Sequence, residues 1–495
     1  MPALPHRHEL YTVAQVRAFD RRAIDGLGIP GIELMQRAAA AAFASLRRHW
    51  PQARRLAVYC GPGNNGGDGF LLAALARKQG LQAEVIALTA VSTGDAALAR
   101  QAWRDAGGAV RLWQSGTALP AADVQVDALY GTGLHRPPAP EVAALIAAIA
   151  ASGQPVLALD VPSGLAADTG DVPGAVLPAD VTISFIAAKR GLYTGRAAEV
   201  VGRLELAPLD LPESLWQGVP PDAVLLSPEC LPRRPRAAHK GANGHVLAIG
   251  GDHGLAGAIR LCGEAALRAG AGLVSVATRA DHLLALNAAR PELMAHGVAD
   301  GDALAPLLAR ASVLALGPGL GQGDWSRALW RAALASGKPL VLDADGLNLL
   351  ARAPAPLAQP GVLTPHPGEA ARLLATTAAA VEADRFATVR ALARRYRAVV
   401  VLKGAGSLIA APDGKVAVCP WGNPGMATGG MGDLLTGVIA ALMAQGCDAW
   451  RAACLGVGLH ARAGDCAARH GERGLLASDL LAPLRALGNG LDDDE

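Results

Sequence analysis

A strand, a glycine-rich loop and a helix in residues 55–80 organise the first half of the chain. Residues 56–60 are an apolar run, and GPGNNGGDG follows over residues 61–69. Helical spacing then runs from Phe70 to Gln79, with Gly80 where a C-terminal cap belongs. A loop of this kind leaves free backbone N–H groups at the start of a helix, and such groups attract anions. The unit therefore predicts a strand of a parallel sheet with a ligand site at its end.

The loop matches one common nucleotide motif only in part. Its glycines fit the G-x-G-x-x-G spacing of a dinucleotide fingerprint, but the acid expected at the end of the second strand is missing. Asn64, Asn65 and Asp68 supply more side-chain oxygens than a pyrophosphate turn needs. The loop suits a cation, a ribose or a polarised amide, and an ordinary tight turn between strand and helix is the alternative.

Composition limits the class of protein. A chain of 495 residues with 51% hydrophobic residues and a net charge of +2 predicts a soluble protein of two or three domains. We expect small-molecule substrates and a homo-oligomer. Because the charge is balanced, we expect neither nucleic acid nor a membrane as partner. The seven cysteines form no C-x-x-C pair, and the N-terminus has no apolar signal segment. The cytoplasm is the expected location.

Strand and helix patterns alternate twice along the chain. Between the two series, residues 208–235 are rich in proline and have little periodicity. We therefore expect two α/β domains, residues 1–220 and 225–495, each with a parallel sheet covered by helices.

Three strand ends in the first half carry polar residues. Besides the loop at 61–69, Asp127 lies in VDALYGTGLHRPP, and Asp160 and Ser163 lie in VLALDVPSGL. A single aspartate at a strand end is commonly only a helix cap. The carboxyl ends of parallel strands share one edge of a sheet, so the three segments together predict a ligand site there.

These three segments, GNNGGDG, DALYGTGL and DVPSGL, resemble the epimerase domain of bifunctional NAD(P)H-hydrate repair enzymes over about residues 10–215. The resemblance implies a Rossmann-like three-layer α/β/α fold, a potassium ion held by Asn65, Asp127 and Ser163, and contact between Asp160 and the reacting substrate. The residues it implies for binding the hydrated nucleotide are Asn64, Asn65, Gly66, Gly67, Asp68, Gly131, Thr132, Gly133, Leu134, His135, Arg136 and Pro137.

A second glycine-rich segment, residues 428–433, opens a helix in the other half. Gly429, Gly430 and Gly432 would present backbone N–H groups to a phosphate. Asp433 beside them could take a proton from a substrate hydroxyl, or it could simply cap the helix. No G-x-x-x-x-G-K-[ST] segment occurs, which disfavours a Walker-type NTPase.

About residues 235–490 look like the ribokinase-like dehydratase of the same repair enzymes. The segments that carry this resemblance are, in this order, GGDHGLAGA, GPGLG, DADGLN, TPHPGE, LKGAGS and MATGGMGD. The resemblance implies that Asp433 deprotonates the hydrate's hydroxyl, that ADP, with Mg²⁺, phosphorylates it, and that phosphate then leaves. The residues implied to contact the hydrate are Ala258, Gly319, His366 and Asp433, although His366 could be a loop histidine without this role. Those implied to hold the nucleotide are Lys403, Gly404, Ala405, Gly406, Ser407 and Gly432.

The leading hypothesis is therefore a repair enzyme that interconverts the R and S hydrates of NADH and NADPH and dehydrates the S form. One alternative is a kinase for a vitamin precursor or sugar, fused to a nucleotide-binding module. Another alternative is that the first domain is a non-catalytic binding or scaffolding module. The presence of Asp160 together with the three proposed potassium ligands argues against this alternative.

Overall fold

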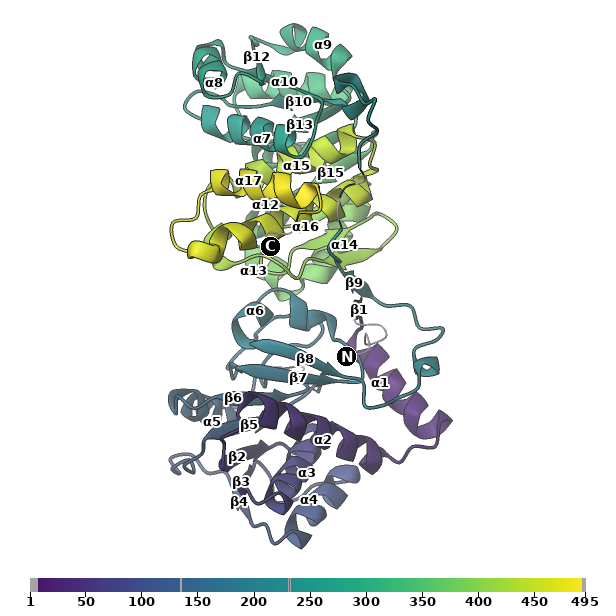
Figure 1. Cartoon of the computed structure of the whole chain (residues 1–495), viewed down its shortest axis with the longest axis vertical. Coiled ribbons are helices and arrows are strands. Elements are labelled where there is room, and N and C mark those ends of the chain that lie inside the picture. The colour runs from purple at the N-terminus through teal and green to yellow at the C-terminus, as the bar shows by residue number, and fades with distance from the viewer. Residues whose placement is uncertain (1–7, 134–135, 230, 232, 492–495) are drawn as a thin grey trace. The chain divides into compact units, whose positions relative to one another are not determined.

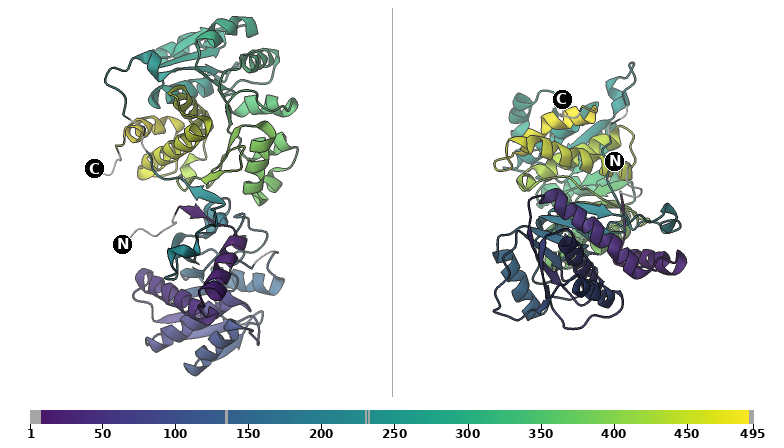
Figure 2. Two further views of the ribbon diagram at one scale, coloured as in Figure 1. Left: turned by 90° about the vertical axis from the view of Figure 1, so that its right-hand side faces the viewer. Right: turned by 60° about the horizontal axis from the view of Figure 1, so that its bottom comes forward.

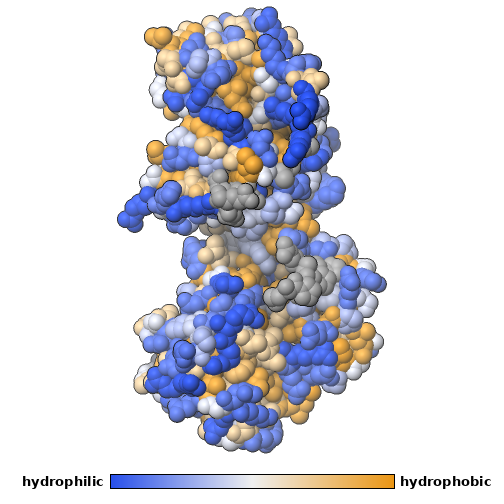
Figure 3. Space-filling model, viewed as in Figure 1, coloured by the Kyte–Doolittle hydropathy of each residue, from blue (hydrophilic) through white to orange (hydrophobic). Residues whose placement is uncertain are grey.

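The protein divides into two compact units, residues 1–224 (unit 1) and 225–495 (unit 2). The structure is a computed structural model that describes residues 8–133, 136–229, 231 and 233–491. Within those residues, no helix has both the length and the apolar character needed to cross a membrane. On the face drawn in Figure 3, hydrophilic residues are interspersed with hydrophobic ones.

Unit 1 is a parallel sheet with helices on both faces (Figure 1), which confirms the predicted three-layer fold. The strand order is β4-β3-β2-β5-β6-β7-β8, and each neighbouring pair is parallel. The strands are β2 (Arg55–Cys60), β3 (Gln82–Ala87), β4 (Val110–Leu112), β5 (Val124–Ala128), β6 (Val156–Leu159), β7 (Val181–Phe185) and β8 (Arg203–Ala207). The helices are α1 (Val13–Arg21), α2 (Gly31–His49), α3 (Asn64–Lys78), α4 (Asp95–Asp105), α5 (Pro140–Ala151) and α6 (Ala197–Val200).

Alternating side chains of the central strand β2 fill two separate cores. Leu56 and Val58 pack with residues of α2, α3 and α4. Ala57 and Tyr59, on the opposite face, pack with residues of α5. A strand buried on both faces needs a continuous apolar run, and this is why residues 56–60 lack polar side chains. Figure 2 gives two further views of these layers.

The structure corrects the predicted loop over residues 61–69, because α3 already begins at Asn64. The glycines of its first turns serve close packing. A Cβ on Gly66 would lie 2.0 Å from the carbonyl oxygen of Gly61, and one on Gly67 would lie 2.4 Å from the sulfur of Met35. These approaches are possible only without a side chain, so the glycine-rich stretch folds as helix and packs tightly.

Helix α1 begins at a capping box formed by Thr12 and Gln15. The Thr12 side chain accepts a hydrogen bond from the backbone N–H of Gln15, and the Gln15 side chain accepts one from the backbone N–H of Thr12. A short π-helical segment, η1 (Arg22–Gly26), continues it. Ile24 of this segment is 38% exposed, whereas Ala23 is buried. Upstream of α1, β1 (Glu9–Leu10) pairs antiparallel with β9 (Ala223–Leu225).

Unit 2 is a larger mixed sheet with helices on both faces, and it confirms the predicted α/β class. Its order is β12-β11-β10-β13-β14-β15-β16-β17-β18, parallel from β12 to β16 and antiparallel beyond. The strands are β10 (His245–Ile249), β11 (Leu273–Thr278), β12 (Met294–Gly297), β13 (Val313–Leu316), β14 (Leu340–Leu342), β15 (Gly361–Leu363), β16 (Val399–Leu402), β17 (Leu408–Ala410) and β18 (Val416–Val418). The helices are α7 (Ala256–Arg268), α8 (Leu283–Ala289), α9 (Gly301–Arg310), α10 (Asp324–Ala335), α11 (Ala344–Arg352), α12 (Pro367–Leu374), α13 (Ala378–Ala383), α14 (Arg385–Tyr396), α15 (Met431–Ala444), α16 (Ala449–Ala467) and α17 (Leu481–Gly488).

Helices α7 and α15 pack closely in the core of unit 2. Cys262 and Ala265 of α7 are fully buried there. Val438 and Ile439 of α15 are fully buried in the same core. A Cβ on Gly437 would lie 2.0 Å from the carbonyl oxygen of Cys262, so glycine sets how closely the two helices approach.

We expect Gly437→Ala to destabilise unit 2 by about 1–3 kcal/mol or more, because the added methyl group overlaps a backbone oxygen. Hydrogen exchange of α7 and α15 peptides measures the loss. The control is Gly257→Ala in the first turn of α7, where a Cβ meets nothing within 4 Å. The control should keep or slightly raise stability. Equal protection in the two variants would contradict this account of the packing.

Candidate active sites

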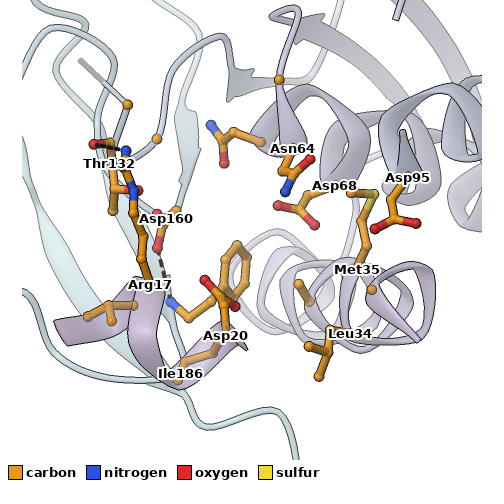
Figure 4. A pocket seen from close by; sticks show the side chains of 18 of the residues that line it. Arg17, Asp20, Leu34, Met35, Asn64, Asp68, Asp95, Thr132, Asp160 and Ile186 are labelled. Carbon is orange, nitrogen blue, oxygen red and sulfur yellow. Dashed lines mark hydrogen bonds between the residues drawn. The ribbon is translucent and has the colours of Figure 1, made fainter. Parts of the chain in front are cut away.

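Unit 1 contains a cavity of about 550 Å³ at the carboxyl ends of its strands. The strand order reverses between β2 and β5, and the loops that follow these two strands form part of the wall. Helices α1, α2 and α3 form another part, and the loops after β6, β7 and β8 contribute Asp160, Lys189 and Leu209. Figure 4 shows the polar side chains that line it, among them Arg17, Asp20, Asn64, Asp68, Thr132 and Asp160.

Asp160 lies in this wall in an ion pair with a buried lysine. Its φ is +65°, a left-handed conformation uncommon for aspartate, and it follows directly after β6. The Lys189 ammonium group donates to Asp160 Oδ1 at 2.5 Å, to Ser184 Oγ at 3.0 Å and to the Phe185 carbonyl oxygen at 2.8 Å. These three bonds use every N–H of the ammonium group, and they offset the cost of burying its charge.

Asp127 and Ser163 form a fully buried pair behind the cavity. Ser163 donates to Asp127 through its hydroxyl at 2.6 Å and through its backbone N–H at 2.8 Å. The Ser163 hydroxyl also accepts from the backbone N–H of Tyr130 at 2.8 Å, which ties the ends of β5 and β6 together. Burial raises the pKa of Asp127 to about 6, although these hydrogen bonds oppose the rise.

The side-chain amide of Asn65 is buried at this site without a hydrogen-bond partner among the described residues. Neither its amide nitrogen nor its amide oxygen has a hydrogen bond within the described chain. A Cβ on Gly131 would lie 3.3 Å from the Asn65 side chain and 3.1 Å from Asp160 Oδ2, so Gly131 separates the two. Buried amides are normally paired, and this one therefore fits a polar ligand or a cation. Amide, hydroxyl and carboxylate oxygens are a donor set that suits a hard cation.

Two further carboxyl groups line the cavity. Burial raises the pKa of Asp20 to about 6, and Asp160 adds to the rise while Lys189 opposes it. Burial also raises the pKa of Asp68 well above its usual range, with Asp160 and Asp20 adding to it. The charges of these carboxyl groups, of Asp160 and of the Lys189 ammonium group thus act on one another across this cavity.

The predicted binding residues of unit 1 fall into three groups. Those that line the cavity are Asn64, Asn65, Asp68, Gly131, Thr132, Gly133 and Asp160. Gly66 and Gly67 face the protein interior, and Arg136 and Pro137 are exposed and do not line the cavity. Leu134 and His135 lie outside the described residues.

In unit 2, Asp343 and Lys403 form a second buried ion pair at the strand ends. Lys403 Nζ lies 2.7 Å from Asp343 Oδ1, and the Thr436 hydroxyl donates to Asp343 Oδ2 at 2.9 Å. Burial favours the neutral form of each partner of the ion pair. Their attraction outweighs burial, so the pKa of Asp343 is lowered and that of Lys403 is raised.

Asp433 lies next to this pair in the first turn of α15. Gly430, at φ +92°, precedes the helix, and no side chain caps it. The Asp433 side chain has no hydrogen bond among the described residues. The geometry therefore does not support the alternative that Asp433 simply caps the helix. Burial, with a further contribution from Asp343, raises the pKa of Asp433 to about 6. A Cβ on Gly432 would lie 3.1 Å from Lys403 Nζ, so the glycine backbone and the ammonium group face the same space.

His366 caps the N-terminus of α12. Its Nδ1 accepts from the backbone N–H of Gly368 at 3.0 Å, and its own backbone N–H donates to Glu369 at 2.8 Å. Its side chain is nevertheless half-exposed. Glu369 Oε2 lies 3.8 Å from Lys403 Nζ, which places His366 close to the Asp343–Lys403 pair.

The other predicted residues of unit 2 lie in the first turn of α7 and in loops that follow strands of the sheet. Ala258 of α7 is next to Gly319, where a Cβ would lie 3.2 Å from that of Ala258. The segment 403–407 connects β16 to β17, and Gly404 and Gly406 both have positive φ. The Ser407 hydroxyl donates to the carbonyl oxygen of Gly404 at 2.9 Å, closing a tight turn.

Among the polar residues of the two sites that were not predicted are Asp20, Lys189, Asp343 and Glu369. Lys189 and Asp343 follow apolar strands, which is a signal that could have identified them. Asp20 lies in the last turn of an amphipathic helix and Glu369 in a capping box, and neither position marks a functional residue.

Two family models match the chain in succession. Residues 31–191 match the family described as YjeF-related protein N-terminus. Residues 246–485 match the family described as NAD(P)H-hydrate dehydratase.

Relatives match over nearly the whole chain. The bifunctional NAD(P)H-hydrate repair enzyme Nnr of Coxiella burnetii is 48% identical, covering 97% of this chain and 99% of its own. That of Escherichia coli is 45% identical, covering 97% and 94%. Among solved structures, the ADP/ATP-dependent NAD(P)H-hydrate dehydratase of Bacillus subtilis, co-crystallised with ATP and Mg²⁺, is 29% identical with a TM-score of 0.49, covering 53% of this chain and 95% of its own.

We expect Lys189→Met to destabilise unit 1 by about 3 kcal/mol, because Asp160 then loses the partner of its buried charge. The double variant Lys189→Met/Asp160→Asn should recover part of the loss, giving a coupling energy of about 1–3 kcal/mol. Hydrogen exchange of unit 1 peptides is the suitable measurement, since the two units need not unfold together. Strictly additive effects would show that the pair is not coupled.

Proposed function

The chain belongs to the family of bifunctional NAD(P)H-hydrate repair enzymes, and we propose that its two units divide the repair between them. Unit 1 is the epimerase, which interconverts the R and S hydrates of NADH and NADPH. Unit 2 is the dehydratase, which uses ADP to convert the S hydrate back to NAD(P)H, giving AMP and phosphate. The full-length relatives support both activities in one chain. The alternative hypothesis, a kinase fused to a binding module, would not explain why the first half of the chain matches these enzymes.

In unit 1, Asp160 is the proposed substrate-contacting carboxylate. It faces the cavity, and Lys189 fixes its position and balances its charge. The pocket-lining members of the proposed binding set lie around it, namely Asn64, Asn65, Asp68, Gly131, Thr132 and Gly133. A carboxylate in this position can accept the hydroxyl proton of the hydrate when the ring opens.

Potassium is the proposed cation of the epimerase pocket. Asn65 would contribute its unpartnered amide oxygen, and Asp127 and Ser163 would contribute oxygens from the buried pair. Such an ion would supply fixed positive charge near the nucleotide without taking part in bond making. A large monovalent cation suits this site because its donors are mostly neutral oxygens.

In unit 2, the observation that carries the proposal is the uncapped Asp433 beside Lys403 at the start of α15. Asp433 takes the proton from the hydroxyl of the hydrate. The backbone N–H groups of residues 429–432 and the Lys403 ammonium group offset the negative charge of the transferred phosphate. Asp343 holds Lys403 in place.

The proposed nucleotide site is the tight turn 403–407 with Gly432, and Mg²⁺ would neutralise the phosphates there. Ala258, Gly319 and His366 would contact the hydrate from the loops around Asp433. Two further proposals follow the sequence alone, namely that the enzyme is a homo-oligomer and that it acts in the cytoplasm.

A direct test of the whole proposal uses purified hydrate containing both epimers, with ADP. The wild-type chain should restore the absorbance of NADH completely. Asp160→Asn should restore only the S fraction quickly, because the R fraction then has to epimerise without the enzyme. Phosphorylation of vitamin precursors by ATP, with no recovery of NADH, would favour the kinase instead.

We expect Asp433→Asn to slow dehydration by at least about 100-fold while nucleotide binding stays within about tenfold. In the wild type, the rate should rise with pH through about 6 and then level off, because the base must be ionised. The folded pKa lies above the unfolded one, so Asp433 lowers stability as pH rises from about 4 to 6. The variant should therefore be at least as stable at pH 7, by up to about 2 kcal/mol. Near-normal turnover would exclude Asp433 as the base.

We expect Asp127→Ala to weaken epimerisation and its dependence on potassium, since one proposed ligand and the partner of Ser163 are both lost. Dehydration of pure S hydrate should not change. Epimerisation is followed in potassium, sodium and lithium buffers, and calorimetry with potassium chloride measures binding without turnover. Parallel loss of both activities would indicate general misfolding, and unaltered potassium dependence would remove Asp127 from the cation site.

A further inference from the structure

Helix α1 brings a carboxyl group into the unit 1 cavity that no sequence motif includes. Asp20 lies near the end of α1 and lines the cavity together with Asp160 and Lys189. Figure 4 shows the side chains of Asp20, Asp68 and Asp160 around the same space. Asp20 has neither a hydrogen bond nor an ion pair within the described part of the chain, and it precedes the stretch 31–191 that matches the family model.

The charges around Asp20 allow it to carry a proton near neutral pH. Arg17 and Arg21 of α1 and Lys189 after β7 favour its ionised form, whereas burial and the charge of Asp160 disfavour it. Burial is the strongest of these effects, and the result is a pKa of about 6. Asp68 of α3, whose own pKa is raised by the charge of Asp20, faces the same group of residues.

Other groups of the pocket are less suited to donating a proton. Every N–H of the Lys189 ammonium group is already donated, to Asp160, Ser184 and Phe185. Asp127 is fully buried and does not line the cavity. Asp68 is only 8% exposed, whereas Asp20 is partly open to solvent and can exchange its proton with water.

Epimerisation of the hydrate needs two proton-transferring groups. The carbon that carries the hydroxyl is also bonded to the ring nitrogen. When a base removes the hydroxyl proton, the C=O bond forms, the C–N bond breaks, and the nitrogen takes a proton from an acid. After the new carbonyl group turns its other face, the nitrogen attacks it, returns its proton, and the oxygen regains its own. No atom or electron is gained or lost, and one carboxyl group cannot serve both atoms at once.

We propose that Asp20 is the second proton-transferring residue of the epimerase pocket, giving a proton to the ring nitrogen while Asp160 accepts the hydroxyl proton. The inference rests on the proposed epimerase function and assigns the acid that this function requires. It makes helix α1, which lies outside the glycine-rich motifs, part of the active site.

The test follows exchange between the separated epimers by NMR, with the full-length chain and no nucleotide. Asp20→Asn should slow exchange by at least about 100-fold and keep the dissociation constant for the hydrate within about threefold, because the amide is isosteric but cannot transfer the proton. Asp20→Glu should restore at least a tenth of the wild-type rate. The step in the wild-type pH profile near pH 6 that belongs to Asp20 should vanish in Asp20→Asn.

Asp25→Asn is the matched control, because Asp25 is an exposed acid in the segment that continues α1. It should exchange epimers within about twofold of the wild type. Dehydration of pure S hydrate by unit 2 should be unchanged in all three variants, which excludes general misfolding.

Three results would overturn the inference. One is exchange by Asp20→Asn within about threefold of the wild type. Another is weaker hydrate binding with an unchanged maximal rate, which would make Asp20 a binding residue. The third is that Asp68→Asn abolishes the pH step while Asp20→Asn retains it. If the wild type itself exchanged the epimers no faster than buffer, the proposed epimerase function would fail and the inference with it, and this outcome is distinct from the other three.

Discussion

A buried lysine–aspartate ion pair lies at the carboxyl edge of each parallel sheet, and both sites are arranged around it. Lys189 with Asp160 serves unit 1, and Lys403 with Asp343 serves unit 2. Two opposite charges removed from water are tolerated only when hydrogen bonds complete their coordination, as Ser184 and Phe185 do in unit 1. Each pair then fixes a charge at a defined point of its pocket.

Each ion pair also has a neighbouring carboxyl group whose side chain has no hydrogen bond or ion pair to the residues that the structure describes. Asp20 in unit 1 and Asp433 in unit 2 both have a pKa raised to about 6, chiefly by burial, with a nearby aspartate adding to the rise. A carboxyl group that changes charge near neutral pH is suited to transferring protons. The two units have different sheet orders and different glycine-rich segments, yet they combine a fixed ion pair with a titrating carboxyl group in the same way.

Glycine has a different role in each pocket. In α3 it permits close packing, since Gly66 and Gly67 face the protein interior and leave the polar side chains of the segment to line the cavity. Before α15, Gly430 supplies a positive φ, and Gly432 leaves room beside Lys403 Nζ. The same residue type therefore builds a wall in unit 1 and exposes backbone N–H groups in unit 2.

The sequence by itself determined the two α/β units and most of the motifs at their strand ends, because apolar runs, glycines and strand-end aspartates are local features that parallel sheets use in a fixed way. It could not give the start of α3 at Asn64, since glycine is permitted in loops and in packed helices alike. Only the tertiary structure brought Asp20 and Lys189 to Asp160 and left Asn65 without a partner. These are long-range contacts, and burial, which sets the pKa of Asp20 and Asp433, exists only once the units have folded.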